Sequence, residues 1–232
     1  MRKNKIYSVL VMLSLACIGN LSAQWNIKVG YAGGFMKAPV LNAVVDNFNN
    51  KYNTFEDKLD PFRSIHGLEI GLRYRLNSVG FEASWNSMSS RSDFIGKLPG
   101  SNANFQDRWF LSMTEYSFGL ENYIGNFGYG ASLGYRTFRM KTDITGAPRK
   151  KRLVAEDPGF ASKFYILYQV PGNKVGIAFK PYVQFPLQEI DISSFDQDLN
   201  VQFNDNYNAA KPQLEKFFMY GISIVLYNGK QY

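Results

Sequence analysis

Apolar and polar residues alternate with a period of two along much of this chain, most clearly over 64–86. The alternation is interrupted at Asn77-Ser78, so the pattern predicts a β-hairpin with a very short turn. With this turn, Arg73 lies opposite Glu82 on the polar face, where opposite charges attract. The apolar face consists of His66, Leu68, Ile70, Leu72, Tyr74, Leu76, Val79, Phe81, Ala83 and Trp85.

The same alternation predicts eight strands of about ten residues, the length that a tilted strand needs to cross a bilayer. The fourth strand is the least regular, which indicates a β-bulge. Pro181 fits the seventh poorly, because proline removes one donor from the strand ladder. The predicted strands are 25–35, 64–76, 79–86, 108–122, 127–137, 160–170, 175–185 and 216–227.

Short and long connections alternate between these strands. The short ones, 77–78, 124–126 and 171–174, contain Asn, Gly or Pro as turns require. This alternation predicts an all-β, eight-stranded antiparallel up-and-down transmembrane β-barrel with short periplasmic turns and long extracellular loops. The long connections are about 36–63, 87–107, 138–159 and 186–215.

Alternation alone does not say which face points inward, so a soluble barrel or sandwich is the alternative. The composition favours a membrane barrel, because the chain has 19 Phe, 15 Tyr and 3 Trp, and several of these lie at strand ends. Charged residues that share a face with glycines likewise indicate an enclosed polar lumen. No segment after the N-terminus approaches the roughly 18 apolar residues of a membrane-spanning helix.

The N-terminal residues 1–23 have the pattern of a cleaved signal peptide, with basic residues, an apolar region and Ala23 before the cleavage point. The predicted mature barrel domain, 24–232, then contains no cysteine and forms no disulfide. A lipoprotein signal cut before Cys17 is the alternative, although Ser14 occupies the position that usually carries Leu. Export without a helical anchor leaves a secreted soluble β-protein or a membrane barrel, and we predict the barrel, with the outer membrane as its location.

The polar faces of the predicted strands carry charged residues of both signs, which we expect to point into the lumen. The interior of an eight-stranded barrel is just filled by side chains. These charges therefore predict a paired polar core, with a gated ion path as the alternative. They are Lys28, Glu69, Arg73, Arg75, Glu82, Glu115, Glu121, Arg136, Lys163 and Lys180.

A cluster of basic residues in the third long connection is a candidate lipopolysaccharide-binding site, because Arg and Lys bind phosphate well. A solvated loop is the alternative interpretation. The 26 Lys and Arg nearly balance the 19 Asp and Glu outside this cluster, which argues against nucleic acid as a partner. The cluster consists of Arg139, Lys141, Arg149, Lys150, Lys151 and Arg152.

The first long connection contains an apolar stripe at helical spacing. Such a stripe must be covered, so it either folds over the barrel mouth as a plug or docks a partner protein. The stripe consists of Val40, Leu41, Val44, Val45, Phe48 and Tyr52.

Two further patterns bear on chemistry. Asp196, Asp198 and Asn200 have the spacing of a calcium loop, but the Gly and Glu that such a loop requires are missing, so no metal or cofactor is predicted. His66, the only histidine, has Ser64 nearby, the combination that a lipid A-modifying enzyme could use. No carboxylate has a fixed spacing to these two residues, so we predict no enzymatic activity.

The strings LSAQWNIKVGYAGGF, GLENYIGNFGYGASLGYR and FFMYGISIVLY resemble small eight-stranded outer-membrane barrels of Gram-negative bacteria. The pattern is similar to the Bacteroidota-type outer-membrane barrel domain and to OmpA-, OmpX- and PorT-like barrels. The resemblance implies a monomer that contacts outer-membrane lipid and lipopolysaccharide and acts as a structural or surface interaction barrel. A component of a type IX-like protein secretion machinery, with envelope or secretion proteins as partners, is the alternative, and a lipid A-modifying enzyme is the third.

Overall fold

The computed structural model describes residues 23–52, 57–97, 104–144, 151–201 and 212–229. The predicted signal peptide therefore lies almost entirely outside the described residues. The elements are β1 (Ala23–Lys37), α2 (Pro39–Lys51), β2 (Ser64–Leu76), β3 (Val79–Lys97), β4 (Asn104–Ile124), β5 (Phe127–Ile144), β6 (Arg152–Val170), β7 (Val175–Pro186), β8 (Ile190–Asp191), α3 (Ser193–Val201), β9 (Leu214–Glu215) and β10 (Phe218–Asn228).

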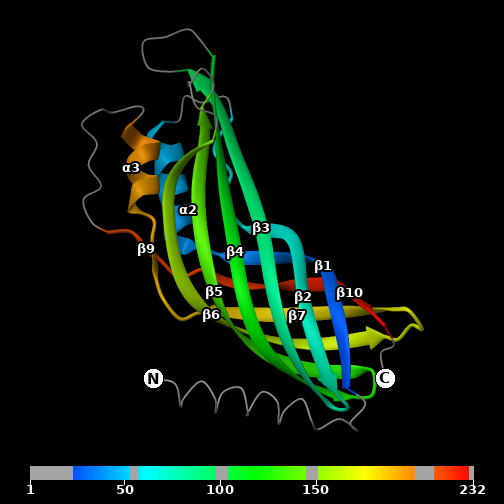
Figure 1. Ribbon diagram of the computed structural model, residues 1–232. Helices are drawn as coiled ribbons and strands as arrows, with labels where there is room; N and C mark the ends of the chain where they lie inside the picture. The colour runs from blue at the N-terminus through cyan, green and yellow to red at the C-terminus, as the bar shows by residue number, and fades with distance from the viewer. Residues whose placement is uncertain (1–22, 53–56, 98–103, 145–150, 202–211, 230–232) are drawn as a thin grey trace, which may run out of the picture.

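Eight of these strands close into one antiparallel barrel in the order β1-β10-β7-β6-β5-β4-β3-β2, while β8 pairs with β9 outside it (Figure 1). This confirms the predicted up-and-down β-barrel. The hairpin register is also as predicted, with Arg73 opposite Glu82. Asn77 and Gly125 lie in two of the three tight turns and have positive φ angles of 46° and 62°, a conformation that Asn and Gly tolerate.

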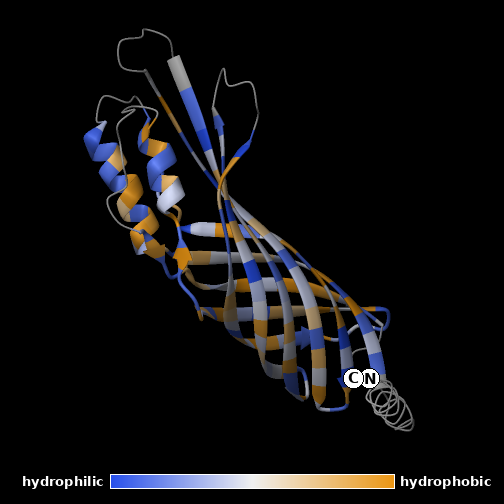
Figure 2. Ribbon diagram, turned by 60° about the vertical axis from the view of Figure 1, so that its left-hand side comes forward, coloured by the Kyte–Doolittle hydropathy of each residue, from blue (hydrophilic) through white to orange (hydrophobic). Residues whose placement is uncertain are grey.

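The barrel wall is apolar outside and charged inside. Trp25, Phe118 and Ile166 expose between 60% and 68% of their surface, whereas Lys28 and Arg73 expose none. Figure 2 shows the resulting alternation of apolar and polar residues along the strands. A soluble barrel buries its apolar face, so this sidedness is the reverse of the soluble alternative.

Aromatic side chains form a girdle at each end of the apolar wall. At the end with the tight turns, Trp25 contacts Tyr74 with ring centres 4.7 Å apart, and Phe127 contacts Tyr168 at 4.9 Å. We call the opposite ring the cap-end girdle, and it shows similar contacts between strands, such as 5.4 Å between Tyr135 and Phe160. The cap-end girdle consists of Phe35, Tyr116, Tyr135, Phe160, Phe185, Phe218 and Tyr220.

Strands β3 to β6 have 18 to 21 residues and extend beyond the other barrel strands, which have 11 to 15. We call this part the extension. The long loops predicted over 87–107 and 138–159 are therefore wrong in large part. The amphipathic pattern inverts in the extension, so that its inner face is apolar and its outer face polar. The inner face carries Met88, Phe94, Trp109, Leu111, Met113, Phe138 and Met140.

The strand ladders of the barrel contain two local irregularities, a register shift between β5 and β6 and a break between β6 and β7. β4 pairs with β3 without interruption, so the bulge predicted in the fourth strand is wrong. The register shift lies at Met140/Lys141 of β5, where Val154 of β6 is the extra residue. The β6–β7 ladder breaks between Tyr165↔Tyr182 and Tyr168↔Phe179. Pro181 lies in this gap and has no N–H to donate.

Helices α2 and α3, strands β8 and β9 and the segment 57–63 fold over the inner face of the extension (Figure 1). We call this unit the cap. A helix as short as α2 is marginal alone, so its packing on the extension holds it. No helix in the described part of the chain has the length and apolarity needed to span a membrane. The shared core includes Leu41, Val45, Phe48, Leu59, Phe62, Phe94, Trp109, Phe138, Phe195, Leu199 and Phe217.

Side chains from distant positions fix α2 in the cap. Ala38, at its N-cap, provides no side-chain hydrogen bond. Glu215 of β9 accepts a hydrogen bond from the Leu41 N–H at 2.8 Å and thereby caps the helix from another loop. Asn42 and Asn49, two turns apart on α2, each exchange two hydrogen bonds with the backbone of the returning segment, at Phe62 and Leu59.

Candidate functional sites

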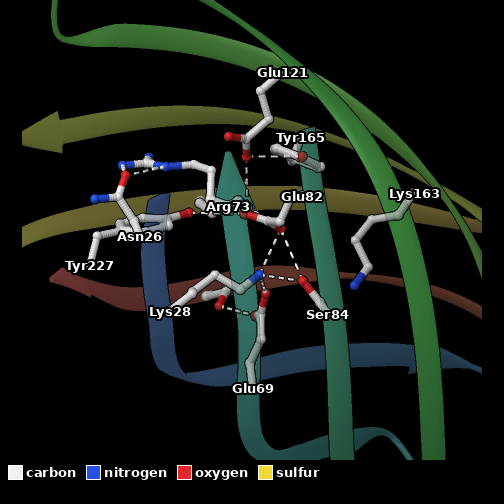
Figure 3. Close-up of polar contacts among 12 residues, drawn as sticks. Asn26, Lys28, Glu69, Arg73, Glu82, Ser84, Glu121, Lys163, Tyr165 and Tyr227 are labelled. Atoms are coloured by element: carbon white, nitrogen blue, oxygen red, sulfur yellow. Dashed lines mark hydrogen bonds and ion pairs between the residues drawn. The ribbon is translucent and has the colours of Figure 1, made fainter. Parts of the chain in front are cut away.

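The lumen contains a network of buried charges centred on Glu82 of β3 (Figure 3). Its Oε1 lies 2.6 Å from the Lys28 Nζ and 2.9 Å from the Lys180 Nζ. Its Oε2 accepts hydrogen bonds from the Lys180 Nζ at 2.9 Å and from the Tyr227 hydroxyl at 3.0 Å. The carboxylate is therefore held by groups from β1, β7 and β10 at once.

Two further carboxylates extend the network. Glu69 of β2 also contacts Lys28 and accepts a hydrogen bond from the Ser223 hydroxyl at 2.5 Å. Glu121 of β4 lies 3.0 Å from the Lys180 Nζ and accepts a hydrogen bond from the Tyr165 hydroxyl at 3.0 Å. Buried ion pairs are tolerated when hydrogen bonds satisfy the remaining lone pairs, and these hydroxyls meet that need.

Arg73 completes the network at its turn-end side. Its guanidinium donates to the Asn26 Oδ1 at 2.9 Å and to the Tyr123 hydroxyl at 3.0 Å, and its central carbon lies 3.6 Å from the centre of the Tyr227 ring. The predicted pairing of Arg73 with Glu82 thus describes the register, but the ion pairs given above join Glu82 to two lysines. Three cations and three carboxylates balance one another in this cluster, namely Lys28, Arg73, Lys180, Glu69, Glu82 and Glu121.

The other predicted lumen residues lie at either end of this cluster. Glu115 pairs with Lys163 at 3.0 Å. Arg75, toward the turns, donates to the Asn77 carbonyl at 2.9 Å and stacks over Tyr123. Arg136, below the cap, donates to the carbonyl of Phe217 at 3.3 Å. All ten predicted residues occupy inward positions, although the structure divides them into one balanced network, one pair and two arginines.

The lumen and the barrel mouth are both filled. A cavity of about 20 Å³ remains beside Glu69, Glu82 and Lys180, and this is room for about one water molecule. Above it, the apolar core of the cap closes the mouth. The arrangement suits a closed barrel, and the ion-path alternative has no open route through the described lumen.

The apolar stripe of the first long connection is part of this closure. Leu41, Val44, Val45 and Phe48 are at most 5% exposed, while Val40 and Tyr52 are half-buried against the same core. The stripe therefore covers the mouth from within the molecule and does not form an exposed docking surface. Burial raises the pKa of Glu215, which caps the helix that carries the stripe.

The predicted basic cluster divides between two surfaces. Arg139 pairs with Glu156 at 2.8 Å on the outer face of the extension, and this hydrogen bond lowers the pKa of the Glu156 carboxyl. The Lys151 Nζ lies 4.7 Å from the centre of the Phe110 ring, and Lys141 occupies an outward position of β5. Arg152 turns to Asp198 of α3 instead, at 2.5 Å. Arg149 and Lys150 lie outside the described residues.

His66 and the acidic residues at calcium-loop spacing contact neighbouring side chains. His66 shares a hydrogen bond with the Tyr31 hydroxyl at 2.5 Å, and the described part of the chain brings no carboxylate within hydrogen-bond range of its ring. Asp196 and Asn200 lie on α3 and bond to each other at 3.0 Å. No group of three or more potential metal ligands occurs among the described residues.

Sequence reasoning missed the polar residues that complete the network. Tyr123, Tyr165 and Tyr227 are buried and aim their hydroxyls into the lumen. Asn26 and Ser223 serve the same purpose on β1 and β10. The period of two places all of these residues on the inward face. A tyrosine near a strand end is nevertheless easily taken for an outward girdle residue when its alternate position on the strand is not checked.

Comparisons with known proteins give structural likeness only. No family model matches the chain, and no curated protein sequence matches it. Neisserial surface protein A is similar with a TM-score of 0.45 and 9% identity, covering 89% of this chain and 98% of its own. Ail of Yersinia pestis, solved with the heparin analogue sucrose octasulfate, has a TM-score of 0.42 and 10% identity and covers 88% and 98%. Function is therefore inferred from the geometry of this chain.

Proposed function

We propose that this protein is an outer-membrane β-barrel of a Gram-negative bacterium that does not conduct and that displays its cap at the cell surface as a structural or interaction module. The single observation that carries the proposal is the double closure, by the charged network in the lumen and by the apolar core under the cap. A channel needs a continuous open polar path. Paired side chains fill the lumen, and the apolar core covers the mouth, so neither layer leaves such a path.

The outer wall supports the membrane location. On β5, Phe127 and Tyr135 mark the two girdles and lie eight residues apart. At about 3.4 Å per residue and a tilt of about 40°, this corresponds to roughly 21 Å, close to the apolar band of about 25 Å of outer-membrane barrels. The large exposed apolar side chains between the girdles then face lipid.

Neither alternative function has a comparable basis. A docking role in a type IX-like secretion machinery would use the stripe on α2, whose central residues Leu41 and Val45 are fully buried. A lipid A-modifying enzyme would need an acid to orient His66, and its ring hydrogen-bonds Tyr31. The cap surface and the outer wall of the extension remain as the parts that a partner can reach.

Cysteine labelling in intact cells tests the proposal. Ser194 of α3 and Asn173 of a tight turn are both exposed and lie at opposite ends of the barrel. We expect a membrane-impermeant maleimide to label Ser194→Cys in intact cells and Asn173→Cys only after permeabilisation. Wild-type protein provides the blank.

Conductance of the purified protein in a planar bilayer provides the second measurement, and we expect no unitary steps. Labelling of Asn173→Cys alone in intact cells, or steady single-channel currents from wild-type protein, would contradict the proposal.

A further inference from the structure

The outer wall of the extension is layered along the strands. On β4, the outward residues above Tyr116 of the cap-end girdle are Thr114, Ser112 and Phe110. On β5, the residues of the outer face beyond Tyr135, toward the cap end, are Thr137, Arg139 and Lys141. From the girdle toward the cap end, the wall thus changes from aromatic to hydroxyl-bearing and then to cationic.

The strand register gathers the cationic layer around one aromatic ring. Phe110 of β4 lies directly opposite Arg91 of β3 and Lys141 of β5. Directly opposed residues have Cβ atoms about 5 Å apart on the same face. The Lys151 Nζ approaches the face of the same ring at 4.7 Å. Three cationic residues are therefore neighbours of one half-exposed phenyl ring, and the charged group of Lys151 lies over its face.

Positive charge predominates on this wall. Its described outward cations are Arg91, Arg108, Arg139, Lys141 and Lys151, against the carboxylates Asp93, Asp143 and Glu156. Arg91 pairs with Asp93, and Arg139 with Glu156, both at 2.8 Å and both largely exposed to solvent. Exposed pairs of this kind contribute little to stability, so a stronger anion can replace the carboxylate.

We propose that this wall binds an anionic glycolipid of the outer leaflet, with Arg91, Phe110, Lys141 and Lys151 as its headgroup site. Acyl chains would lie against the apolar wall below Tyr116, sugar rings against the hydroxyl layer and Phe110, and phosphates or carboxylates at the cations. Phe110 lies six residues beyond Tyr116 on β4, which corresponds to roughly 16 Å. This inference rests on the proposed location in the outer membrane.

Binding of lipopolysaccharide to the full-length mature protein in neutral detergent tests the site. The probe is purified lipopolysaccharide, measured by displacement of a fluorescent derivative at low and high salt. The test variant is Arg91→Gln/Phe110→Ala/Lys141→Gln. The control variant, Lys58→Gln/Lys174→Gln, removes the same charge from exposed positions elsewhere. We expect the affinity of the test variant for lipopolysaccharide to fall by roughly tenfold or more and to depend less on salt. We expect the control variant to bind as wild type does.

Competition experiments distinguish a glycolipid from a free anionic sugar and from an anionic phospholipid as the ligand. We expect the delipidated oligosaccharide and phosphatidylglycerol each to compete less well than whole lipopolysaccharide. Equal competition by either one would overturn the glycolipid assignment, and so would equal affinity of the test and control variants. The labelling of Ser194→Cys is independent of this site, so failure here leaves the proposed topology standing, whereas wrong-sided labelling removes both.

Discussion

At the scale of single residues, Glu82 is the carboxylate that joins the lumen network across several strands. Its two oxygens contact Lys28, Lys180 and Tyr227, which come from three strands. Burial of three carboxylates and three cations is unfavourable unless every charge has a partner. A residue with several buried partners therefore has a larger effect on stability than its own desolvation implies.

We expect Glu82→Ala to destabilise the barrel by about 3–5 kcal/mol, because Lys28 and Lys180 lose a shared counter-charge in a buried site. The measurement is the temperature at which the fast-migrating folded form disappears on a denaturing gel. Glu189→Ala is the matched control, since its pair with Lys216 is 3.3 Å long and largely exposed, and exposed pairs contribute at most about 1 kcal/mol. Equal transitions for Glu82→Ala and Glu189→Ala would count against the central role of Glu82.

The period of two is sufficient to place these residues inside the barrel, but not to identify their partners. Arg73 and Glu82 are neighbours in a hairpin, so their register follows from the turn. Glu82 and Lys180 are 98 positions apart and meet only because the barrel closes. Contacts across a lumen depend on barrel shear and side-chain length, and no local pattern contains either quantity.

At the scale of elements, α2 shows how one loop depends on another. It begins at Pro39 without a side-chain cap of its own, and Glu215 accepts the Leu41 N–H from 174 positions away. The sequence pattern predicts the apolar stripe of this helix, because a stripe is a local property. It does not predict that Glu215 accepts the hydrogen bond at the helix N-terminus, because the pairing of β8 with β9 places Glu215 there.

The pH dependence of the cap follows from Glu215. Burial raises its folded-state pKa above the ordinary value of 4.5, so the folded cap takes up protons that the unfolded chain releases. The contribution of Glu215 to stability is thus fully present below about pH 4.5 and is lost as the pH rises through the folded pKa. We expect Glu215→Gln to remove this dependence.

Hydrogen exchange of the α2 amides, corrected for intrinsic rates, is the measurement at each pH. Asp46→Asn is the control, because Asp46 is exposed on the same helix, and we expect it to retain the wild-type trend. An identical pH trend in Glu215→Gln and wild type would contradict the assignment.

The extension explains why the alternation predicts strands that are too short. Within the apolar wall the outward residues are apolar, and the predicted strands end where this rule stops. Beyond the cap-end girdle the rule reverses, so that Trp109 and Phe138 point inward beneath the cap while Arg91 and Lys141 point outward. The strand continues, but in the proposed outer-membrane location its surroundings change from lipid to water. A prediction that follows the polarity of the outward residues interprets that change as a loop.

At the scale of the whole molecule, the barrel has two closures of opposite chemistry in series. The lumen is closed by charge pairing, which depends on buried partners such as Glu82 and Lys180. The mouth is closed by apolar packing, which depends on side chains such as Val45 and Phe195. The two layers lie at different levels of the barrel and consist of different side chains, so we expect that weakening one leaves the other in place.

We therefore expect conductance only when both closures are weakened. Val45→Asp places an unpaired charge in the apolar core and should detach the cap, yet the lumen cluster remains filled and the barrel should stay silent in a planar bilayer. Glu82→Ala alone should be silent as well, because the cap still covers the mouth. The double variant should show ion currents, provided that its folded form is first verified by gel migration. Steady currents from Val45→Asp alone would contradict the lumen closure, and a silent, folded double variant would contradict closure by these two layers.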